Sequence, residues 1–337
     1  MPERDAPARD DISAEERLIA RCFRPLATHP GALGLADDAA VLTPPPGCDL
    51  VLTTDGVIAG VHFFSDDPPE TIGRKALRMN LSDLAAKGAQ PAGFLLSIAL
   101  PAGIDEAWLA AFAAGLGDDA ERYQCPLLGG DTDRTPGPIS VSIAAFGTVP
   151  QGKIIRRSTA KAGDRIVVTG TIGDAALGVL LRPDRDMAKR LRLSDAASAH
   201  LQDRYLKPQP RNAVAGAVLQ YASAAMDVSD GLAGDLAKLC RASHVAAEVD
   251  AARVPLSDAA RAVLAAEPSL LETALTGGDD YEILLTLPSE RLKAFHAAAT
   301  EAGVAATEIG HVVAGQGAHF VRDGKSLRFA RPSFSHF

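Results

Sequence analysis

The chain has 337 residues, of which 47% are hydrophobic and 23% are charged, with a single tryptophan. This composition is typical of a compact globular protein, and the length is sufficient for two domains of ordinary size. The net charge of −8 argues against a nucleic-acid or anionic-membrane partner, because either would require a basic surface. It does not argue against a phosphorylated small molecule, since bound Mg²⁺ reverses the local field.

The cysteines and the N-terminal residues indicate the cellular compartment in which the protein is expected. Cys22, Cys48, Cys125 and Cys240 are far apart and form no CxxC pair, so a zinc ribbon is not expected, and scattered free thiols suit a reducing compartment. Residues 1–11 are polar and lack the apolar core of a signal peptide, and the apolar run at 94–100 is too short to span a bilayer. We therefore expect a cytoplasmic protein.

The first 28 residues are predicted to form a polar lead-in and one helix. Ser13 and Glu16 form a capping-box pattern, and an apolar face follows, which places the helix at 13–27.

A first domain is predicted at 29–150. Its elements, in chain order, are a loop at 31–34, short strands at 39–42 and 50–54, a helix at 71–87, a strand at 93–100, a helix at 105–122 and a strand at 139–149. Between the helix at 105–122 and the strand at 139–149, an apolar segment is followed by Gly129, Gly130 and Asp131. We expect these three residues to form a loop.

A second domain is predicted at 151–337. Its elements are strands at 165–169, 246–249, 281–287, 307–313 and 319–322, and helices at 173–181, 232–242, 258–266 and 290–302, with a solvated helix over 183–203. Because strands and helices mix in both halves, the predicted fold class is α/β or α+β, with two mixed-sheet domains and flanking helices.

Acidic segments beside apolar ones recur along the chain. Glycine lets the backbone approach a ligand closely, and the acids that follow supply the hard oxygen ligands that Mg²⁺ prefers. Besides Gly129 to Asp133, the segments are Asp37-Asp38, Thr53-Thr54-Asp55, Asp83, Asp227-Val228-Ser229-Asp230 and Gly277-Gly278-Asp279-Asp280. We expect several of these loops to converge on one polyanion through several metal ions.

No Walker-type phosphate loop and no GxGxxG after a strand occurs in the sequence. If the protein uses ATP, metal ions and backbone amides must hold the phosphates. That is chemically sufficient, because phosphoryl transfer depends on positioning and charge neutralisation.

Each segment also has an ordinary structural explanation. Asp37-Asp38 could be a solvated turn, the acid at the end of the 50–54 strand could belong to an Asp-Gly turn, and a lone His62 in an apolar setting is more often packed than catalytic. Ser229 or Asp230 could simply cap the helix at 232–242.

Two more segments have alternatives of the same kind. Asn80, Ser82 and Asp83 lower the helix propensity of 71–87, which suits a functional position or a polar stripe that faces solvent. Arg156-Arg157 could be a solvated linker or a cation aimed at phosphate.

Taken together, the segments resemble the thiamine-monophosphate kinase family over nearly the whole chain, from about 15 to 337. The resemblance rests on 36–40, 53–63, 75–77, 80–86, 129–132, 157–164, 168–174, 227–232, 277–282 and the terminal His336-Phe337. The wider superfamily, which includes aminoimidazole ribonucleotide synthetase and selenophosphate synthetase, shares the fold and some of the acids. The segments at 61–63 and 277–282 favour the thiamine branch.

The resemblance implies that the γ-phosphoryl group of MgATP is transferred in line to thiamine monophosphate, without a covalent nucleophile on the enzyme. The implied ligands of several Mg²⁺ ions are Asp38, Thr53, Thr54, Asp55, Asp83, Asp131, Asp227 and Asp230. Those of the ATP phosphates are Gly130, Asp131, Arg157 and Ser229, and those of the thiamine phosphate are His62, Asp279 and Phe334. It also implies a homodimer whose N-terminal sheets pair, with ATP in a groove between domains.

The chain departs from the family pattern at two positions. Ala36 stands where the family usually has glycine, and Asp279 where it often has glutamate. Two other functions therefore stay open: a different ATP-dependent synthetase of the superfamily, or a non-catalytic protein that binds nucleotide or thiamine phosphate. Cys22 lies on a predicted helix face, which speaks against a selenium enzyme with a reactive N-terminal cysteine.

Overall fold

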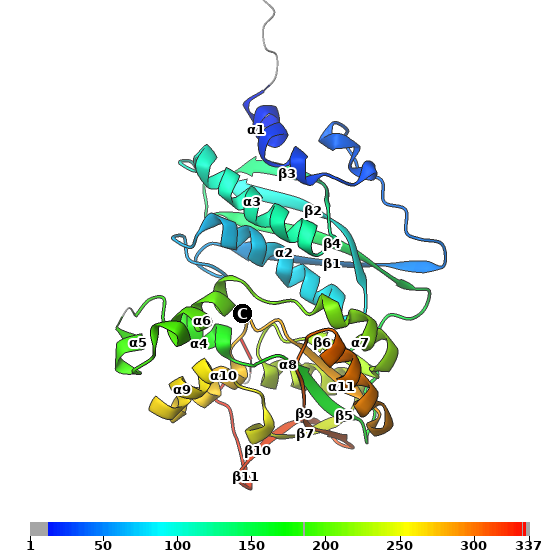
Figure 1. Cartoon of the computed structure of the whole chain (residues 1–337), viewed down its shortest axis with the longest axis vertical. Helices are drawn as coiled ribbons and strands as arrows, with labels where there is room; N and C mark the ends of the chain where they lie inside the picture. The colour runs from blue at the N-terminus through cyan, green and yellow to red at the C-terminus, as the bar shows by residue number, and fades with distance from the viewer. Residues whose placement is uncertain (1–12, 185, 332, 335–337) are drawn as a thin grey trace, which may run out of the picture.

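Two mixed β-sheets, each flanked by helices, make up the computed structural model of the chain (Figure 1). The structure describes residues 13–184, 186–331 and 333–334. The predicted fold class of two mixed sheets with helices is confirmed. Within these residues, no helix is both long and apolar enough to cross a membrane.

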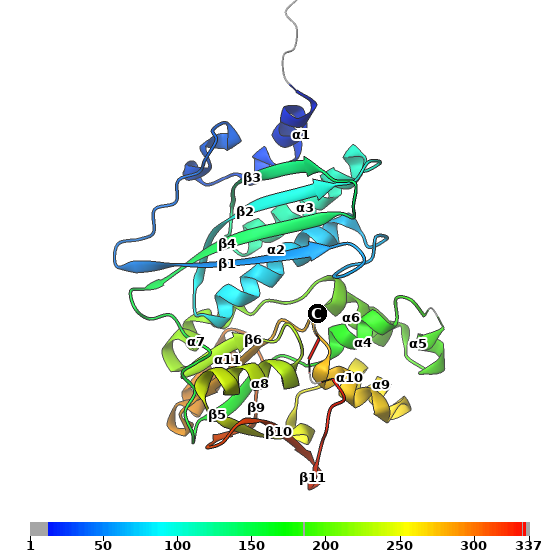
Figure 2. The same ribbon diagram turned by 180° about the vertical axis from the view of Figure 1, so that it is seen from behind.

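The N-terminal sheet has four strands in the order β1-β4-β2-β3. They are β1 (Cys48–Ile58), β2 (Gln90–Leu100), β3 (Leu127–Arg134) and β4 (Ser140–Pro150), and only β2 and β3 are parallel to each other. The helices α2 (Pro69–Ala86) and α3 (Glu106–Arg122) cover one face, toward which β4 buries Val141, Ile143 and Ala145. Figure 2 shows the opposite face turned to the viewer, with the two helices behind the strands. We call this the open face of the sheet.

The chain before the sheet differs from its prediction. The capping box of Ser13 and Glu16 is confirmed, but α1 (Ala14–Cys22) ends early and passes into the 3₁₀ turn Arg24–Leu26, because Pro25 cannot continue an α-helix. A second 3₁₀ segment spans Pro30–Leu35. The predicted strand at 39–42 is wrong. There the backbone N–H of Val41 bonds to the carbonyl of Gly31 instead of a strand partner.

The C-terminal sheet has seven strands in the order β11-β10-β7-β9-β5-β8-β6, of which only β7 and β10 pair in parallel. The strands are β5 (Arg165–Thr169), β6 (Ala224–Asp227), β7 (Ala246–Asp250), β8 (Ile283–Leu287), β9 (Ala306–Val313), β10 (Gly317–Arg322) and β11 (Lys325–Ser326).

Successive side chains of β5 point to opposite faces of this sheet, and helices cover both faces. Ile166 and Val168 pack in one core with α8 (Leu232–Ser243), whereas Val167 packs in another with α7 (Ala215–Tyr221) and α11 (Leu292–Glu301). Both faces are therefore buried, as expected for strands that read as continuous apolar runs.

Besides the helices that cover its two faces, the C-terminal half has a further group of helices beside the sheet. It contains α4 (Asp174–Leu180), α5 (Met187–Arg190), α6 (Asp195–Leu206), α9 (Asp258–Ala266) and α10 (Leu271–Thr276). The predicted solvated helix at 183–203 is wrong. Two helices form there, and α6 starts at a Ser194 cap and buries Leu201 and Tyr205. The sequence pattern does not predict β3, β6, β11, α7 and α10 as regular elements.

Helix α2 lies between the two sheets and is buried on nearly all sides (Figures 1 and 2). Asn80 and Ser82 have no exposed surface, so a solvent-facing polar stripe is excluded. The helix bonds to the C-terminal half at both Leu81, whose carbonyl accepts from the Asn212 amide (3.1 Å), and Lys87, whose ammonium donates to the Ala225 carbonyl (2.8 Å). The two halves of the chain therefore meet along α2.

Candidate active site

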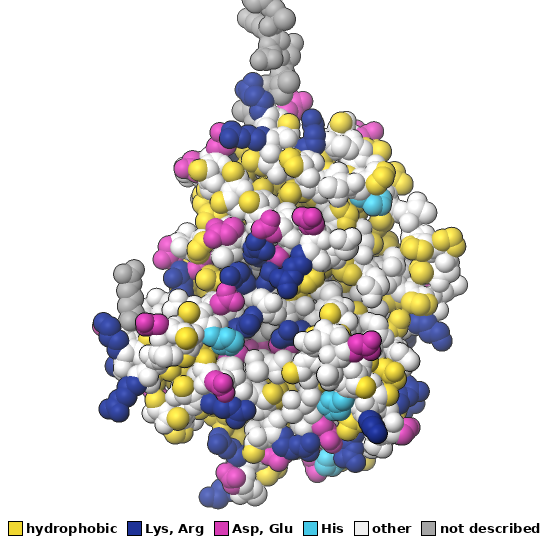
Figure 3. Space-filling model, in the orientation of Figure 1, with side chains coloured by type: hydrophobic (Ala, Val, Ile, Leu, Met, Phe, Trp, Pro, Cys, Tyr) yellow, Lys and Arg dark blue, Asp and Glu magenta, His cyan; other side chains and the backbone are white. Residues whose placement is uncertain are grey.

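A pocket of about 820 Å³ opens between the two sheets, beside α2, and we call it the interdomain pocket. The predicted site residues that line it are Asp55, His62, Asp83, Asp227, Ser229, Asp230, Asp279 and Phe334. Figure 3 shows acidic and basic side chains intermixed over the surface on one side of the molecule. The pocket, in contrast, gathers five carboxylates.

Strand β1 and helix α2 hold the N-terminal acids of this pocket in place. The triplet at 53–55 lies in the middle of β1, not at a strand end as predicted. The Thr53 hydroxyl donates to the Asp83 carboxylate, and the Asp55 N–H donates to Oδ1 of Asn80 (3.1 Å). The Asn80 amide in turn donates to the Ala76 carbonyl one helical turn earlier (3.0 Å). Asn80 is thus a positioning residue whose only signal in the sequence is its poor helix propensity.

Two C-terminal loops are joined backbone to backbone to form the opposite wall. The N–H of Asp279 donates to the Ser229 carbonyl (2.9 Å), and that of Tyr281 donates to the Val228 carbonyl (2.8 Å). A Cβ atom at Gly278 would lie 2.4 Å from the Ser229 carbonyl oxygen, so only glycine permits this approach. Asp279 has a φ of 76°, a left-handed conformation that aspartate tolerates better than most residues.

The ordinary explanation of the 227–231 segment as a helix cap does not hold. The N-cap residue of α8 is Gly231, and no side chain caps that helix end. The Asp230 carboxylate pairs instead with Lys238, and Asp235 accepts from the Asp230 N–H (2.9 Å).

The carboxylates of the interdomain pocket disfavour one another's charge. Burial, and then the charges of Asp83 and Asp230, raise the pKa of Asp55 to about 6. Burial, Asp83 and Asp235 raise the pKa of Asp227 well above its ordinary value. Such a group of hard oxygen donors fits Mg²⁺ chemically, because a divalent cation removes the repulsion.

The pocket is not a closed metal cage. Among the described residues, no three His, Cys, Asp or Glu side chains lie close enough to hold a metal ion by themselves. Mg²⁺ is commonly held by one or two carboxylates together with substrate phosphates, and the arrangement suits that mode.

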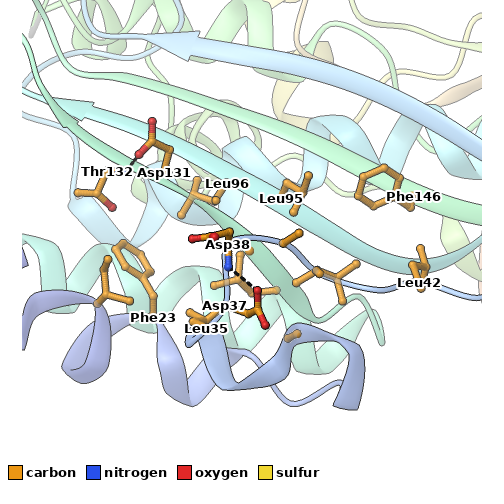
Figure 4. Close-up of a pocket in the computed structure, with 18 of the residues that line it drawn as sticks. Phe23, Leu35, Asp37, Asp38, Leu42, Leu95, Leu96, Asp131, Thr132 and Phe146 are labelled. Atoms are coloured by element: carbon orange, nitrogen blue, oxygen red, sulfur yellow. Dashed lines mark hydrogen bonds between the residues drawn. The ribbon is translucent and has the colours of Figure 1, made fainter. Parts of the chain in front are cut away.

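The other predicted acids line a second pocket, of about 610 Å³, which we call the N-terminal pocket. Figure 4 shows Asp37 and Asp38 on the segment after α1, with Asp131 and Thr132 on a neighbouring strand and Leu95 and Phe146 along the wall.

The glycine-acid segment that enters this pocket is the strand β3 and not a loop, which corrects the prediction. A Cβ atom at Gly130 would lie 1.8 Å from the Leu96 carbonyl oxygen, so contact with β2 by itself requires glycine. Both Asp38 and Asp131 are exposed. Ala36 has a φ of −114°, so this departure from the family pattern carries no left-handed strain.

The two pockets are separated by the width of the sheet. Asp55 pairs with Ile143, which pairs with Leu96, which pairs with Gly130. Three strand spacings of about 4.8 Å place Gly130 roughly 14 Å from Asp55. Within one chain, the acids therefore form two groups and not one.

Two further predicted residues lie apart from the interdomain pocket. Thr54 points to the face opposite Thr53 and Asp55, and its hydroxyl donates to the Ile143 carbonyl (3.0 Å). Arg157 is exposed on the linker between the sheets and lines neither pocket. His336 and Phe337, which were part of the family resemblance, lie outside the described residues.

This fold and these paired acidic sites define a class of protein. Residues 36–149 match the family model for the N-terminal domain of AIR synthase related proteins, and 161–322 match the model for the C-terminal domain. The chain is 43% identical to a thiamine-monophosphate kinase of Caulobacter vibrioides, over 99% of this chain and 96% of the relative. It belongs to the thiamine-monophosphate kinase family.

Solved structures agree with this assignment. The crystal structure of thiamine-monophosphate kinase from Stenotrophomonas maltophilia K279a is 39% identical, with a TM-score of 0.81 over 93% of this chain and 96% of that one. The structure of AaThiL complexed with AMPPCP and TMP is 32% identical, with a TM-score of 0.75 over 89% of this chain and 91% of that one.

Proposed function

We propose that this protein transfers the γ-phosphoryl group of ATP to thiamine monophosphate and releases thiamine diphosphate and ADP. The observation that carries the proposal is the interdomain pocket, which gathers four buried or half-buried aspartates, His62 and Asp279 in a chain whose relatives are thiamine-monophosphate kinases over nearly their full length. The AaThiL complex, which holds AMPPCP and TMP together, supports a site for two substrates.

The reaction balances without a protein base. An oxygen of the acceptor phosphate forms a bond to the γ-phosphorus, while the bond from that phosphorus to the β,γ-bridging oxygen breaks and ADP leaves with the electron pair. A phosphate monoester has a second pKa of about 6, so the attacking oxygen carries no proton at neutral pH. The protein therefore has to align the two phosphates and neutralise their charge.

The acids would contribute to charge neutralisation by holding metal ions. Asp55, Asp83, Asp227 and Asp230 would hold Mg²⁺ on the interdomain side, and Thr53 orients Asp83 through its hydroxyl. Bound Mg²⁺ supplies positive charge to the phosphate oxygens. Ser229, which lines the same pocket, would contact a phosphate oxygen of ATP.

The acceptor would lie against the other wall of the same pocket. His62, Asp279 and Phe334 all line it, and the Phe334 N–H donates to the Asp230 carbonyl (3.0 Å). This arrangement supports an aromatic and acidic wall for the thiamine part, with the phosphate toward the metal-binding acids.

We further propose that a homodimer joins the two groups of acids. The open face carries Leu52, which is 64% exposed, and the exposed Ile58, and such apolar surface is commonly covered by a partner. If the open faces of two copies pair about a two-fold axis along the strands, the β3 edge of one lies over the β1 edge of the other. Asp131 and Asp38 of one copy would then approach Thr54 of its partner, on the edge strand that also carries Asp55.

Leu52→Lys tests the dimer. We expect sedimentation to show the wild type as a dimer and Leu52→Lys as a monomer with lower activity. Val321→Lys is the matched control, because Val321 is an exposed apolar strand residue (38% exposed) in the C-terminal half. A dimeric, fully active Leu52→Lys protein would contradict pairing through the open face.

The domain limits 29–150 and 151–337 remain part of the proposal, as does a cytoplasmic location. All four cysteines are free, and Cys125 and Cys240 are buried, which supports a reducing compartment.

Turnover is tested by incubating the protein with MgATP and thiamine monophosphate and separating the products by chromatography, with an EDTA control. We expect thiamine diphosphate and ADP in equal amounts, and none with EDTA. Binding of thiamine monophosphate without product would favour a non-catalytic binding protein. Neither binding nor product would favour another ATP-dependent reaction of the superfamily.

A further inference from the structure

Lys75 is a buried cation in the segment at 75–77, but it is not among the predicted site residues and does not line the interdomain pocket. It lies on α2, at the helical spacing of Ile72 and Met79, so its position on an otherwise apolar stripe was the available signal in the sequence. Its side chain is 3% exposed, and a buried lysine requires partners for its charge.

Three groups surround the Lys75 ammonium. It donates to Oδ2 of Asp279 (2.7 Å) and to the carbonyl oxygen of His62 (2.9 Å), and it lies 4.1 Å from the centre of the Tyr205 ring. A carboxylate, a carbonyl and an aromatic face account for its direct contacts. The ammonium therefore ties together two walls of the interdomain pocket that come from opposite halves of the chain.

Both partners of Lys75 need such support. Asp279 stands in a left-handed conformation with its side chain 23% exposed, in a loop that bonds to the 227–231 loop through its backbone. Apart from Lys75, its carboxylate accepts a long bond from the Tyr281 hydroxyl (3.4 Å). His62 belongs to a short turn after β1, in which its own Nδ1 accepts from the Ile58 N–H (3.1 Å). A residue in an irregular segment holds its direction only if neighbours fix it.

A second layer holds the Tyr205 ring under the ammonium. The Tyr205 hydroxyl donates to Asp67 (3.2 Å), and Arg182 pairs with Asp67 and with Asp66 (3.1 Å). Arg182 also lies 5.3 Å from the Phe64 ring. The turn that carries His62 is thus clamped to the C-terminal half on its outer side by Arg182 and on its inner side by Lys75.

We propose that Lys75 is a positioning residue for the acceptor substrate, acting through Asp279 and the His62 turn. This role rests on the proposed function. It predicts that loss of the ammonium makes Asp279 and the His62 turn less well ordered. The proposed metal-binding acids, Asp55, Asp83, Asp227 and Asp230, should keep their positions. The proposed role also implies that Asp279, like Asp230 beside Lys238, is already paired with a cation before the anionic substrates enter.

The test combines Lys75→Met with Asp279→Asn. Met keeps the length and apolar stem of Lys75 without the charge. We expect Lys75→Met to raise the KM for thiamine monophosphate about 10-fold or more, with the KM for ATP changed less than about twofold. A roughly tenfold change is what the loss of one hydrogen bond yields. Asp279→Asn should act in the same direction, and the double variant should be no worse than the more impaired single variant, because Lys75 acts through Asp279.

Arg78→Lys is the matched control for general loosening of α2. Arg78 lies one turn further along the helix, is equally buried, and bonds to Asp119 and the Pro208 carbonyl (2.9 Å) away from the pocket. We expect this variant to lower Tm without a selective effect on the KM for thiamine monophosphate.

The outcomes separate the two proposals. Wild-type turnover with unchanged KM values in Lys75→Met, or multiplicative losses in the double variant, would overturn the role of Lys75 alone. A wild type that neither binds nor phosphorylates thiamine monophosphate would overturn the proposed function and this role with it. If Lys75→Met does not fold, Asp279→Asn carries the test, because it keeps the shape of the side chain. An unchanged KM for thiamine monophosphate in Asp279→Asn would then overturn the role.

Discussion

The interdomain pocket and the N-terminal pocket contain the same kind of residue in opposite physical states. Asp227 is 7% exposed, and burial and neighbouring charges raise its pKa, whereas Asp38 and Asp131 are exposed to solvent. Buried carboxylates that face one another are unfavourable unless a cation joins them. We therefore expect a bound metal ion to relieve the repulsion between the carboxylates of the interdomain pocket. The acids of the N-terminal pocket are exposed to solvent, so we expect their charges to be stable without a bound cation.

The largest expected effect comes from removing a charge in the interdomain pocket. We expect Asp227→Asn to lower kcat/KM by about 10³-fold, as loss of a group that stabilises transferred charge does. In EDTA the same variant should have a higher Tm than the wild type, because it no longer ionises a buried carboxylate.

Asp131→Asn is the matched comparison, since it changes the same group on an exposed strand. We expect it to lower activity with no gain of Tm in EDTA. Equal Tm changes in the two variants would contradict the conclusion that the acids of the two pockets differ in burial and electrostatic cost.

Mixing these two inactive variants tests whether the pockets of different copies cooperate. In a heterodimer of Asp131→Asn with Asp227→Asn, one composite site has both native residues and the other has neither. After denaturation and refolding of an equal mixture, half of the dimers are heterodimers, so about a quarter of the wild-type activity should return if assembly is random. Activity that stays at the level of the separate variants would show that each site uses one chain.

A smaller effect is expected from pH. Because the folded-state pKa of Asp55 is raised from 3.8 to about 6, the folded protein holds this proton more tightly than the unfolded chain does. This group's contribution to stability is therefore highest below pH 4, falls between pH 4 and 6, and is constant above that range.

Thermal unfolding in EDTA, compared between the wild type and Asp55→Asn, measures this contribution. The Tm advantage of the variant should grow from pH 4 to 6 and then level off, and saturating Mg²⁺ should reverse it. An advantage that is the same at every pH would show that the Asp55 carboxyl is not perturbed.

The smallest effect is expected at Ala36. Because its φ is −114°, glycine offers no conformational benefit there. We expect Ala36→Gly to change kcat/KM less than about twofold and to lower the free energy of unfolding by about 0.5 kcal/mol. A clear gain of activity would show that the segment carrying Asp38 adopts a left-handed backbone in the working enzyme.

Much of the fold could be predicted because its signals are local. The helix at 71–87 and the strands at 93–100, 139–149 and 165–169 follow from apolar periodicity, and the structure places each within a few residues. Prediction failed where a tertiary contact decides the conformation. The strand β3 carries two glycines and two acids that have low strand propensity, and it forms because β2 lies against its backbone.

The sequence by itself predicted which residues would carry the chemistry. Glycines beside acids, and an Asn-Leu-Ser-Asp run in a helix, are locally unfavourable choices that can be recognised without a structure. Tertiary structure alone decided which acids meet. It divides them between two pockets, buries Asp227 and leaves Asp131 exposed, and brings Lys75 against Asp279, 204 positions later in the chain. The physical reason is that burial and pairwise distance depend on how α2 packs between two sheets, and no local pattern encodes that packing.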